Sequence, residues 1–309
     1  MIKKKYLVTG GLGFIGKAIC ESLLELGNSV VIIDNNFRNK NKFKHKNLTI
    51  YNVDIRNKFK LKKFSKNIDA VIHLAAINGT KYFYEKPELV LDVGIKGIIN
   101  VIDVCKENNI KEIYLASTSE VYQDPPFFPT NEKVRMIIPD PHNPRFSYSS
   151  SKIISEVLLL NSTYFRKAII FRPHNIYGPN MGYEHVIPEI ITKSIKAKKN
   201  IKLQGNGKNK RSFCYIDDFV EGLNLILKKG KHKEIYNIGS PYEINIIDIT
   251  KKILKIINKD LHIKVSNKIF FNAKRRLPDL SKLRKIGYKP KINLNMGLIK
   301  TIEWYKKQI

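Results

Sequence analysis

The chain has 309 residues, of which 43% are hydrophobic and 10% are aromatic. This length and composition allow a large core and exclude an intrinsically disordered protein. The formal net charge of +29 would suit a nucleic-acid-binding protein. However, the lysines are spread over nearly every surface segment and no zinc-finger, RNP or basic heptad pattern occurs, so we expect no nucleic-acid partner.

Neither a membrane segment nor a metal site is indicated. No apolar run reaches the roughly 18 residues of a membrane span, and the basic start MIKKKYLVTGG lacks the apolar segment of a signal peptide. We therefore expect a cytoplasmic protein without a membrane partner. The cysteines Cys20, Cys105 and Cys214 are widely spaced and the histidines form no HExxH pattern, so we expect neither a disulfide framework nor a metal.

Short apolar runs alternate with longer amphipathic stretches through the first half of the chain. The runs have little period-two alternation, which is typical of parallel strands buried on both faces, and the stretches between them have apolar residues at helical spacing. This order predicts a doubly wound parallel sheet of the Rossmann type. The expected strands are residues 5–9, 29–34, 48–54, 70–76, 112–118 and 167–173, and the expected helices are 14–27, 87–109 and 147–165.

After about residue 175 the alternation loosens, with glycine and proline loops between shorter helices. We expect those helices at residues 185–199, 216–229, 244–257 and 294–307. The sequence thus predicts a dinucleotide-binding domain over residues 1–174 and a smaller C-terminal α/β substrate domain over residues 175–309, with segments that can cross between the two.

The first expected strand ends in TGGLGFIG, which places Gly10, Gly13 and Gly16 at a strand-to-helix junction. Glycine is needed there because a Cβ would block the tight turn, the approach of a pyrophosphate and the packing of the helix on the strand. The amides at the start of the helix, at Phe14 and Ile15, would then bind the phosphates. We therefore predict a dinucleotide site.

The next expected strand ends in Asp34, about 20 residues after the glycines, where an acid can bind the ribose hydroxyls of adenosine. Asp34 is followed by Asn35 and Asn36 rather than by arginine. A carboxylate at this place repels a 2′-phosphate, so NAD is favoured over NADP as the cofactor, although Arg38 lies near enough to leave NADP open.

Together, these motifs resemble the extended short-chain dehydrogenase/reductase family, the nucleotide-sugar epimerases and dehydratases. The resemblance spans nearly the whole chain. It is carried by TGGLGFIG, VDIRN, HLAA, STSEVY, YSSSK, RPHNIYGP, GNGKNKRSFCYIDD, EIYNIG and RRLPDLSKLRKIGYKP, in that order. The family's cofactor residues would map to Asp54 and Ile55 beside the adenine and to Leu74, Ala75 and Ala76 along the dinucleotide. His73 we interpret as a core histidine.

Tyr148 and Lys152 are four residues apart at the head of an expected helix and so lie on one face of it. A phenol, whose pKa is about 10, is a poor base at neutral pH, but a nearby ammonium and the positive nicotinamide ring would lower that pKa. The phenolate could then take a proton from a sugar hydroxyl as hydride leaves for NAD. A Tyr and a Lys at this spacing usually lie on the solvent-exposed face of a helix. Here the match to the family's YxxxK motif favours a catalytic pair that also binds the cofactor.

The resemblance implies three further catalytic residues in STSEVY. Thr118 would hydrogen-bond the oxidised hydroxyl, Ser119 would face the substrate and Ser117 the sheet. Glu120 matches the glutamate that removes the C5 proton in the family's 4,6-dehydratases, and the T-S-E order resembles GDP-mannose dehydratases and UDP-glucuronate decarboxylases. Some epimerases also carry this glutamate, and a surface turn acid is the structural alternative.

The same resemblance implies residues for an anionic, nucleotide-linked sugar. Asn175 would touch the substrate, and Arg211 with Arg275 or Arg276 would bind the pyrophosphate, because guanidinium groups suit phosphate geometry. The chain departs from the family pattern at Gln123, where a glycine is usual, at Gly94, where an asparagine is usual, and at His174.

Three functions remain open from the sequence. The first is an NAD-dependent enzyme, serving surface-glycan precursor synthesis, that oxidises C4 of a nucleotide sugar, with epimerisation, 4,6-dehydration, decarboxylation or net oxidation as the outcome. The second is a non-catalytic dinucleotide sensor, and the third a basic nucleic-acid-binding protein. The family resemblance also implies a homodimer or higher homo-oligomer, formed through residues 88–107 and 147–164.

Overall fold

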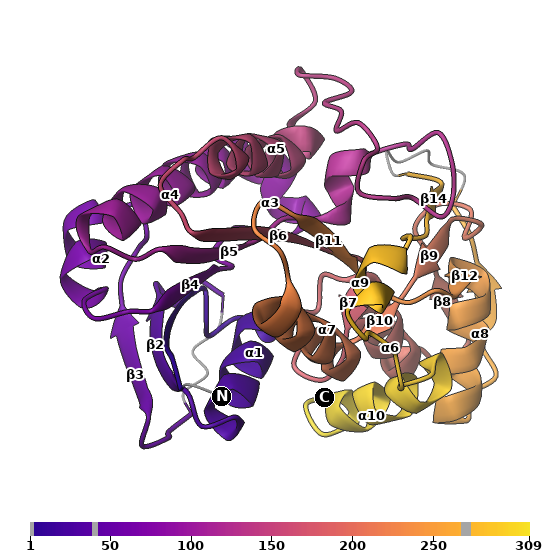
Figure 1. Cartoon of the computed structure of the whole chain (residues 1–309). Coiled ribbons are helices and arrows are strands. Elements are labelled where there is room, and N and C mark those ends of the chain that lie inside the picture. Colours follow the sequence, from indigo (N-terminus) through magenta and orange to yellow (C-terminus); the bar gives the residue numbers. More distant parts are fainter. Residues whose placement is uncertain (1–2, 39–42, 267–272) are drawn as a thin grey trace. The chain divides into compact units, whose positions relative to one another are not determined.

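The computed structural model of the chain describes residues 3–38, 43–266 and 273–309 (Figure 1). The chain divides into two compact units. The first comprises Met1–Val121, Met136–Arg172 and Leu223–Tyr236, and the second comprises Tyr122–Arg135, Pro173–Gly222 and Asn237–Ile309. Each unit is therefore built from segments that are far apart in the sequence.

A seven-stranded sheet forms the centre of the first unit, in the order β11-β6-β5-β4-β1-β2-β3. All pairs from β3 to β6 are parallel. This confirms the predicted doubly wound fold, in which the strand order reverses beside β1. The strands are β1 (Lys5–Thr9), β2 (Ser29–Asp34), β3 (Leu48–Asn52), β4 (Ala70–His73), β5 (Glu112–Ala116), β6 (Lys167–Pro173) and β11 (Ile235–Ile238).

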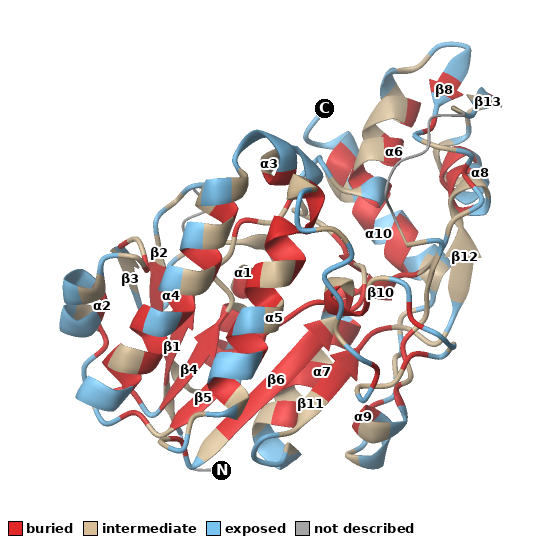
Figure 2. Ribbon diagram, turned by 90° about the horizontal axis from the view of Figure 1, so that it is seen from above, coloured by how far each residue is buried: buried red, intermediate tan, exposed pale blue. Residues whose placement is uncertain are grey.

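Helices cover both faces of this sheet. α2, α4 and α5 lie on one face and α1 lies on the other (Figure 1). On α4 and α5 the outer sides carry exposed residues and the inner sides are buried against the strands (Figure 2). The helices are α1 (Phe14–Glu25), α2 (Lys58–Phe64), α3 (Thr80–Glu85), α4 (Pro87–Glu107) and α5 (Ser147–Leu160), with the 3₁₀ turns η1 (Ser119–Tyr122) and η2 (Pro144–Phe146); α7 (Ile216–Lys229) runs from the second unit into the first.

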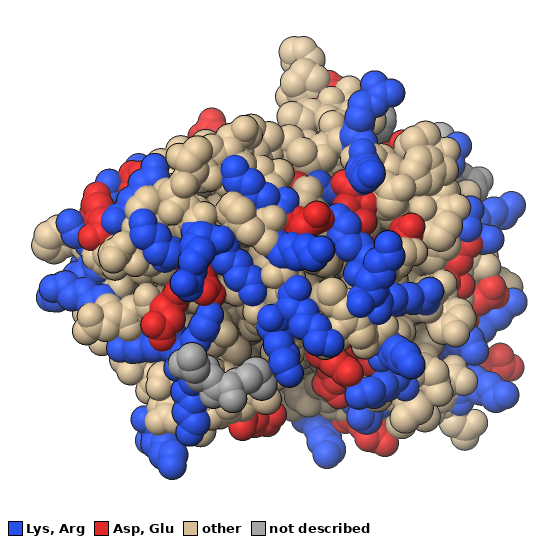
Figure 3. Space-filling model, viewed as in Figure 1, with Lys and Arg blue, Asp and Glu red and all other residues tan. Residues whose placement is uncertain are grey.

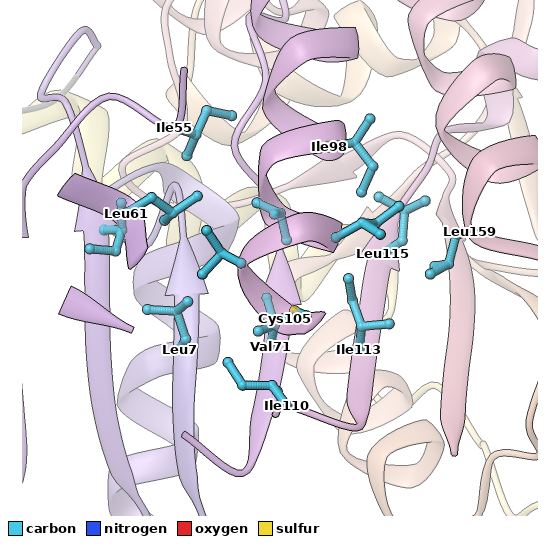
Figure 4. Close-up of a cluster of buried hydrophobic side chains, with 14 of the residues drawn as sticks. Leu7, Ile55, Leu61, Val71, Ile98, Cys105, Ile110, Ile113, Leu115 and Leu159 are labelled. Carbon is cyan, nitrogen blue, oxygen red and sulfur yellow. The ribbon is translucent and has the colours of Figure 1, made fainter. Parts of the chain in front are cut away.

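The core of the first unit lies between the sheet and the α4–α5 face (Figure 4). Leu7, Val71 and Ile113 come from three neighbouring strands and meet Ile98 and Cys105 of α4 in one buried cluster. Parallel strands covered on both faces need continuous apolar runs, which is why the runs in the sequence predicted them. β3 differs because it is the edge strand and is only partly buried.

Two glycines of α4 allow close packing in this core. A Cβ at Gly94 would lie 2.5 Å from Ser151 Oγ of α5, and a Cβ at Gly97 would lie 2.3 Å from Ile55 Cδ1. Gly94 therefore permits α4 and α5 to approach closely, which explains why a larger residue does not stand at this position.

The second unit is a smaller α/β unit, as expected. Its helices α6, α8 and α10 pack against one another, and the apolar side of α8 is buried. Its strands form three small sheets: β7 (Ile176–Tyr177) with β10 (Cys214–Tyr215), β12 (Glu243–Asn245) with β9 (Lys210–Ser212) and β14 (Arg275–Arg276), and β8 (Asn200–Lys202) with β13 (His262–Lys264). The helices are α6 (Val186–Lys196), α8 (Ile246–Ile257), α9 (Ser281–Lys285) and α10 (Leu294–Lys306).

The basic residues do not gather into one patch on the face shown in Figure 3. Lysine and arginine are scattered over it, with acidic groups between them (Figure 3). Among the described residues, no helix is long and apolar enough to cross a membrane. Within the same residues, no group of three or more His, Cys, Asp or Glu side chains is placed to hold a metal ion.

Candidate active site

The glycine-rich loop between β1 and α1 is closely packed. Gly10 has a φ of +71°, and a Cβ there would lie 2.9 Å from the backbone that follows β4; a Cβ at Gly16 would lie 2.2 Å from the Gly10 carbonyl oxygen. α1 starts with Phe14 and Ile15 after the N-cap Gly13, which makes no side-chain capping bond. Because the first amides of a helix have no acceptor within it, they can bind an anion. The loop therefore fits the pyrophosphate of a dinucleotide.

Asp34 lies at the carboxyl end of β2, beside this loop. Its carboxylate accepts hydrogen bonds from the backbone N–H of Leu12 (3.0 Å) and of Asn36 (2.8 Å). Burial raises the pKa of Asp34, and these two backbone hydrogen bonds oppose the rise. The acid predicted for the adenosine ribose is thus held by the loop that is predicted to hold the pyrophosphate.

Asp54, which follows β3, is already paired. Its carboxylate accepts hydrogen bonds from Arg56 Nε (3.0 Å), from Arg56 Nη2 (2.8 Å) and from Asn35 Nδ2 (3.0 Å). The hydrogen bonds from Arg56 lower the pKa of Asp54 to about 2. Ile55 is 4% exposed and packs in the core against Gly97. The structure therefore brings Asn35 to Asp54 but places Ile55 among core side chains.

The segment Leu74–Ala76 continues from β4 past the end of β1. The amides of Leu74 and Ala75 donate to the Thr9 carbonyl (3.1 Å) and to Thr9 Oγ1 (3.3 Å) respectively. His73 is 2% exposed, and its Nδ1 lies 2.7 Å from Thr9 Oγ1. Burial lowers the pKa of His73 to about 3. His73 is therefore a neutral, hydrogen-bonded core residue, as interpreted from the sequence.

Tyr148 lies in the first turn of α5. Its ring stacks on Phe83 with a centroid distance of 5.3 Å and an angle of 10°, and the Thr118 side chain is near enough to act on the pKa of its phenol. Burial raises the pKa of Tyr148, the charge of Glu120 raises it further, and the Thr118 side chain opposes both. The protein groups alone therefore do not lower this pKa as the sequence led us to expect, because burial outweighs the other effects.

Lys152 lies one turn after Tyr148 and is 3% exposed. Its Nζ donates a 2.7 Å hydrogen bond to the Ala116 carbonyl at the end of β5, and it lies 5.9 Å from the centroid of the Tyr148 ring. Burial lowers the pKa of Lys152 to about 8, and the charge of Glu156 opposes this. Lys152 is therefore mostly an ammonium at neutral pH.

Glu156, one turn after Lys152 on α5, belongs to a fully buried polar network. Glu156 on α5 forms a salt bridge with Arg172 on β6, with 2.6 Å between Arg172 Nη2 and Glu156 Oε2 and side-chain exposures of 1% and 0%. Ser117 donates a hydrogen bond from Oγ to the same carboxylate. Ser117 is thus turned toward the interior of the unit, away from solvent.

Glu120 in η1 forms a second ion pair. Arg145 Nη1 donates to Oε2 (2.9 Å) and Arg145 Nη2 donates to Oε1 (3.2 Å). The side chain of Glu120 is 17% exposed and that of Arg145 is 7% exposed. Ser119, its neighbour, is 5% exposed. Glu120 is therefore not the solvated turn acid that the sequence left open.

Three of the predicted substrate residues lie around one strand of the second unit. Arg211 on β9 and Arg276 on β14 are register partners in parallel strands, so their side chains leave the same face of the small sheet. Asn175, in a left-handed backbone conformation (φ +43°), donates from Nδ2 to the Ser212 carbonyl of β9 (3.3 Å).

Arg275 is held differently. Its Nε donates to Glu243 Oε2 (2.7 Å), and its guanidinium lies 4.6 Å from the centroid of the Phe128 ring. Because successive residues of a strand point to opposite faces, Arg275 and Arg276 face opposite ways. Arg276 is therefore the one that shares a face with Arg211.

A sequence model of the NAD dependent epimerase/dehydratase family matches residues 6–239. The chain belongs to this family. It is an enzyme of the NAD-dependent, nucleotide-sugar-modifying group, the extended short-chain dehydrogenases/reductases, and NAD is the cofactor of that family. The predicted family, enzyme class and cofactor are thereby confirmed.

Relatives in this family differ in the reactions that their names state. The chain is 31% identical to the UDP-N-acetyl-alpha-D-glucosaminuronate decarboxylase of Bacillus cytotoxicus, over 99% of each chain. It is 33% identical to the UDP-glucuronate 4-epimerase of Thermodesulfobacterium geofontis, over 98% of this chain and 97% of the relative. The crystal structure of the dTDP-glucose 4,6-dehydratase from Streptomyces venezuelae, with NAD bound, matches this chain with a TM-score of 0.88. The two sequences are 26% identical, and the match covers 98% of this chain and 97% of the dehydratase.

Sequence reasoning missed several residues that surround the family's catalytic positions. Arg145, Glu156 and Phe83 were not singled out, and Arg172 was noted only as part of RPHNIYGP. Arg145 stands three residues before Tyr148, and Glu156 stands four residues after Lys152, so the sequence indicates that both lie near the predicted catalytic residues. The sequence does not indicate the charge partners of Arg145 and Glu156, because those partners lie on other elements.

Proposed function

We propose that this enzyme oxidises the C4 hydroxyl of a nucleotide-linked sugar to a 4-keto sugar. The observation that carries the proposal is the cluster of Thr118, Tyr148 and Lys152 at the carboxyl end of β5 and the head of α5. This cluster belongs to the same unit as the glycine loop and Asp34.

In the proposed reaction, Tyr148 in its phenolate form accepts the proton of the C4 hydroxyl. NAD, when bound, supplies the acceptor for the C4 hydride. Thr118, whose side chain acts on the phenol of Tyr148, orients the phenol toward the hydroxyl. Lys152 provides a positive charge one turn further along α5, 5.9 Å from the centroid of the Tyr148 ring. Its hydrogen bond to the Ala116 carbonyl fixes that charge in place.

For the substrate we propose a uridine diphosphate sugar with a carboxylate at C6. The two relatives described above that are more than 30% identical both act, by their names, on UDP-linked uronates. A C4 ketone next to C5 of such a sugar makes either return of hydride or loss of carbon dioxide chemically accessible. Asn175, Arg211 and Arg276 are the contacts that we propose for the nucleotide-linked sugar, and the two arginines suit its pyrophosphate.

Mass spectrometry of products tests this proposal. Purified enzyme with NAD is incubated with UDP-glucuronate, UDP-N-acetylglucosaminuronate, UDP-glucose, GDP-mannose and dTDP-glucose. The mass of the product identifies the outcome. Loss of carbon dioxide indicates decarboxylation, loss of water indicates 4,6-dehydration and loss of two hydrogens indicates net oxidation. An unchanged mass with a new sugar indicates epimerisation. Binding of NAD without conversion of any of these sugars would support a dinucleotide sensor instead.

Tyr148→Phe is the matching variant, because it removes only the phenol oxygen. We expect turnover to fall by at least about 100-fold with NAD binding retained. Tyr164→Phe is the control, since the Tyr164 hydroxyl bonds the carbonyls of Cys105 and Lys106 in the same unit and takes no part in the proposed step. Full activity of Tyr148→Phe would refute the assignment.

We further propose that the enzyme is a homodimer formed through α4 and α5. Four large apolar side chains on these helices are exposed by 36–49%, which is costly unless they are covered. They are Ile99, Ile154, Val157 and Leu158. Sedimentation analysis should show a dimer for the native chain and a monomer for Val157→Glu, and a native monomer would contradict the proposal.

A further inference from the structure

Lys152 and Glu156 do not form the ion pair that their spacing favours. They stand four residues apart on α5, a spacing at which a lysine and a glutamate are neighbours on the helix surface and commonly pair. Both side chains are buried within the described part of the chain, yet no ion pair joins them. Instead, Lys152 Nζ donates to the Ala116 carbonyl at 2.7 Å. The ammonium is thus directed to the end of β5 and not to the carboxylate one turn away.

The carboxylate of Glu156 is occupied by three other donors. Arg172 Nε donates to Oε1 at 2.8 Å and Arg172 Nη2 donates to Oε2 at 2.6 Å, and Ser117 Oγ donates to Oε1. An arginine that bonds both oxygens fixes the plane of a carboxylate and balances its charge. Little of the attraction of Glu156 therefore remains for Lys152.

The other groups around Lys152 leave its charge to the phenol of Tyr148. On α5, the centroid of the Tyr148 ring lies 5.9 Å from Nζ. On β4, His73 is near enough to be affected by the charge of Lys152, but it is neutral because burial lowers its pKa to about 3. On β6, Arg172 is paired with Glu156. Of these groups, the Tyr148 phenolate is the negative charge that the ammonium is left to stabilise.

We propose that Arg172 and Ser117 are positioning residues that hold the Glu156 carboxylate away from the ammonium on the same helix. Lys152 then remains available to the Tyr148 phenolate, so the inference rests on the proposed oxidation at C4, in which that phenolate accepts the proton. Without the two donors, the attraction between buried opposite charges would turn Lys152 from the end of β5 toward Glu156. A buried ion pair can add little net stability, because desolvation cancels much of its attraction, but this one decides where the charge of Lys152 acts.

Arg172→Met tests the proposal directly, because it removes the counter-charge and nearly keeps the volume. In this variant we expect Glu156 to pair with Lys152. The pKa of Lys152 should then rise by about one unit or more above that of the native enzyme, because an opposite charge favours the ammonium. NMR titration of both proteins, saturated with NAD and labelled with ¹³C at the lysine Cε, measures this pKa. Loss of one resonance in Lys152→Arg identifies the signal.

The kinetics of the same variant should change in two ways. Turnover should fall by about tenfold or more, since part of the contribution of the general base is lost. The decline of kcat/KM above pH 8, where native Lys152 loses its proton, should move to higher pH. A residue that only stabilised the fold would leave this decline in place. Arg166→Met is the control, because it breaks an arginine–carboxylate bond of 2.7 Å to Glu112 at the opposite end of β5 and should change neither quantity.

Two further variants keep the test decisive if Arg172→Met does not fold. Ser117→Ala leaves the buried pair intact and should raise the pKa of Lys152 by about half a unit, because a carboxylate with one donor fewer attracts the ammonium more strongly. The double variant Glu156→Leu, Arg172→Met removes both charges, so nothing draws Lys152 away and most of the turnover should return. Its alkaline decline should lie at or below the native pH, because the charge of Glu156 no longer raises the pKa of Lys152.

Other outcomes overturn the proposal. An unchanged or lowered pKa of Lys152 in Arg172→Met and in Ser117→Ala would contradict it. A raised pKa with undiminished turnover would also contradict it, because the direction of the ammonium would then not matter for the reaction. A native enzyme that reduces no NAD at 340 nm with any of the five nucleotide sugars would instead refute the oxidation at C4. The NMR titration would still decide whether Arg172 and Ser117 keep Glu156 from Lys152.

Discussion

Glu156 and Arg172 form a salt bridge that is closed to solvent. Arg172 Nε donates to Glu156 Oε1 at 2.8 Å and Arg172 Nη2 donates to Oε2 at 2.6 Å. The pair joins α5 to β6, and through Ser117 it also reaches the end of β5. The strand end that carries Thr118 and the helix that carries Tyr148 are thus tied to one buried charge pair.

Removing one partner of this pair should destabilise the fold strongly. In Glu156→Gln the guanidinium of Arg172 stays buried without a counter-charge, which costs about 3–5 kcal/mol of unfolding free energy in comparable cases. Urea denaturation followed by circular dichroism measures this loss. The double variant Glu156→Leu, Arg172→Met should lose less than the single variant, because it leaves no uncompensated charge.

The exposed pair Lys17–Glu21 serves as the control. Its nitrogen–oxygen distance is 3.3 Å and its side chains are 32% and 44% exposed. Glu21→Gln should change the unfolding free energy by less than about 0.5 kcal/mol. Equal effects of Glu156→Gln and Glu21→Gln would show that burial does not govern the strength of these pairs.

Gly16→Ala should disrupt the dinucleotide loop. The added Cβ would lie 2.2 Å from the Gly10 carbonyl oxygen and 2.7 Å from Gly11 Cα, so the loop and the start of α1 must move apart. We expect a loss of roughly 1–3 kcal/mol in unfolding free energy and a loss of NAD binding, measured by calorimetry.

Gly205→Ala is the counterpart of this variant. Gly205 has a φ of +70° but no atom within 4 Å of its would-be Cβ, so alanine there costs only about 1 kcal/mol of backbone strain. NAD binding should remain unchanged. If Gly16→Ala also bound NAD normally, the close packing at the loop would not be what the cofactor requires.

The elements that the sequence predicted well are those whose burial leaves a pattern. β2, β5 and α1 carry continuous apolar runs or a helical stripe, and the structure places them within one or two residues of the expected bounds. α2 was not predicted, because in KFKLKKF only Leu61 is buried and no apolar stripe forms. The two- and three-residue strands of the second unit are likewise too short to show the alternation of apolar and polar residues that predicts a strand.

For the site, the residue types could be predicted from the sequence, but the partners of those residues could not. Glu120 and Arg145 are 25 residues apart on two 3₁₀ turns, and nothing local marks them as a pair. The burial that raises the pKa of Tyr148 in the protein without ligands was not visible from the sequence for a similar reason. The spacing of Tyr148 and Lys152 shows that they share a helix face, but only the structure shows how deeply the phenol is buried.

Turnover should decline as the pH rises through about 8. Burial lowers the pKa of Lys152 to about 8, so its ammonium is present below this pH and is lost above it. The pKa of Tyr148 is raised, so the phenol of the protein without ligands does not titrate in that range. A pH profile of kcat/KM on the proposed substrate measures the decline.

Lys152→Arg tests whether Lys152 causes this decline. A guanidinium stays charged up to pH 12, so the decline near pH 8 should disappear even if the maximal rate is lower. An unchanged profile in Lys152→Arg would assign the titration to another group.

Asp34→Ser should weaken NAD binding and reduce the preference of the enzyme for NAD over NADP. The serine keeps a polar side chain beside the loop but removes the carboxylate that would repel a 2′-phosphate. It also removes the acceptor for the backbone N–H of Leu12 and Asn36, so a loss of about 1 kcal/mol in stability is expected per bond.

Asp69→Ser is the matched control, because Asp69 accepts from the Lys5 amide (2.7 Å) at the opposite end of β1. Calorimetric titration should show that NAD affinity falls about tenfold or more, a typical charge-assisted loss, in Asp34→Ser and not in Asp69→Ser. Equal NAD affinities in the two variants would remove Asp34 from the proposed cofactor contacts.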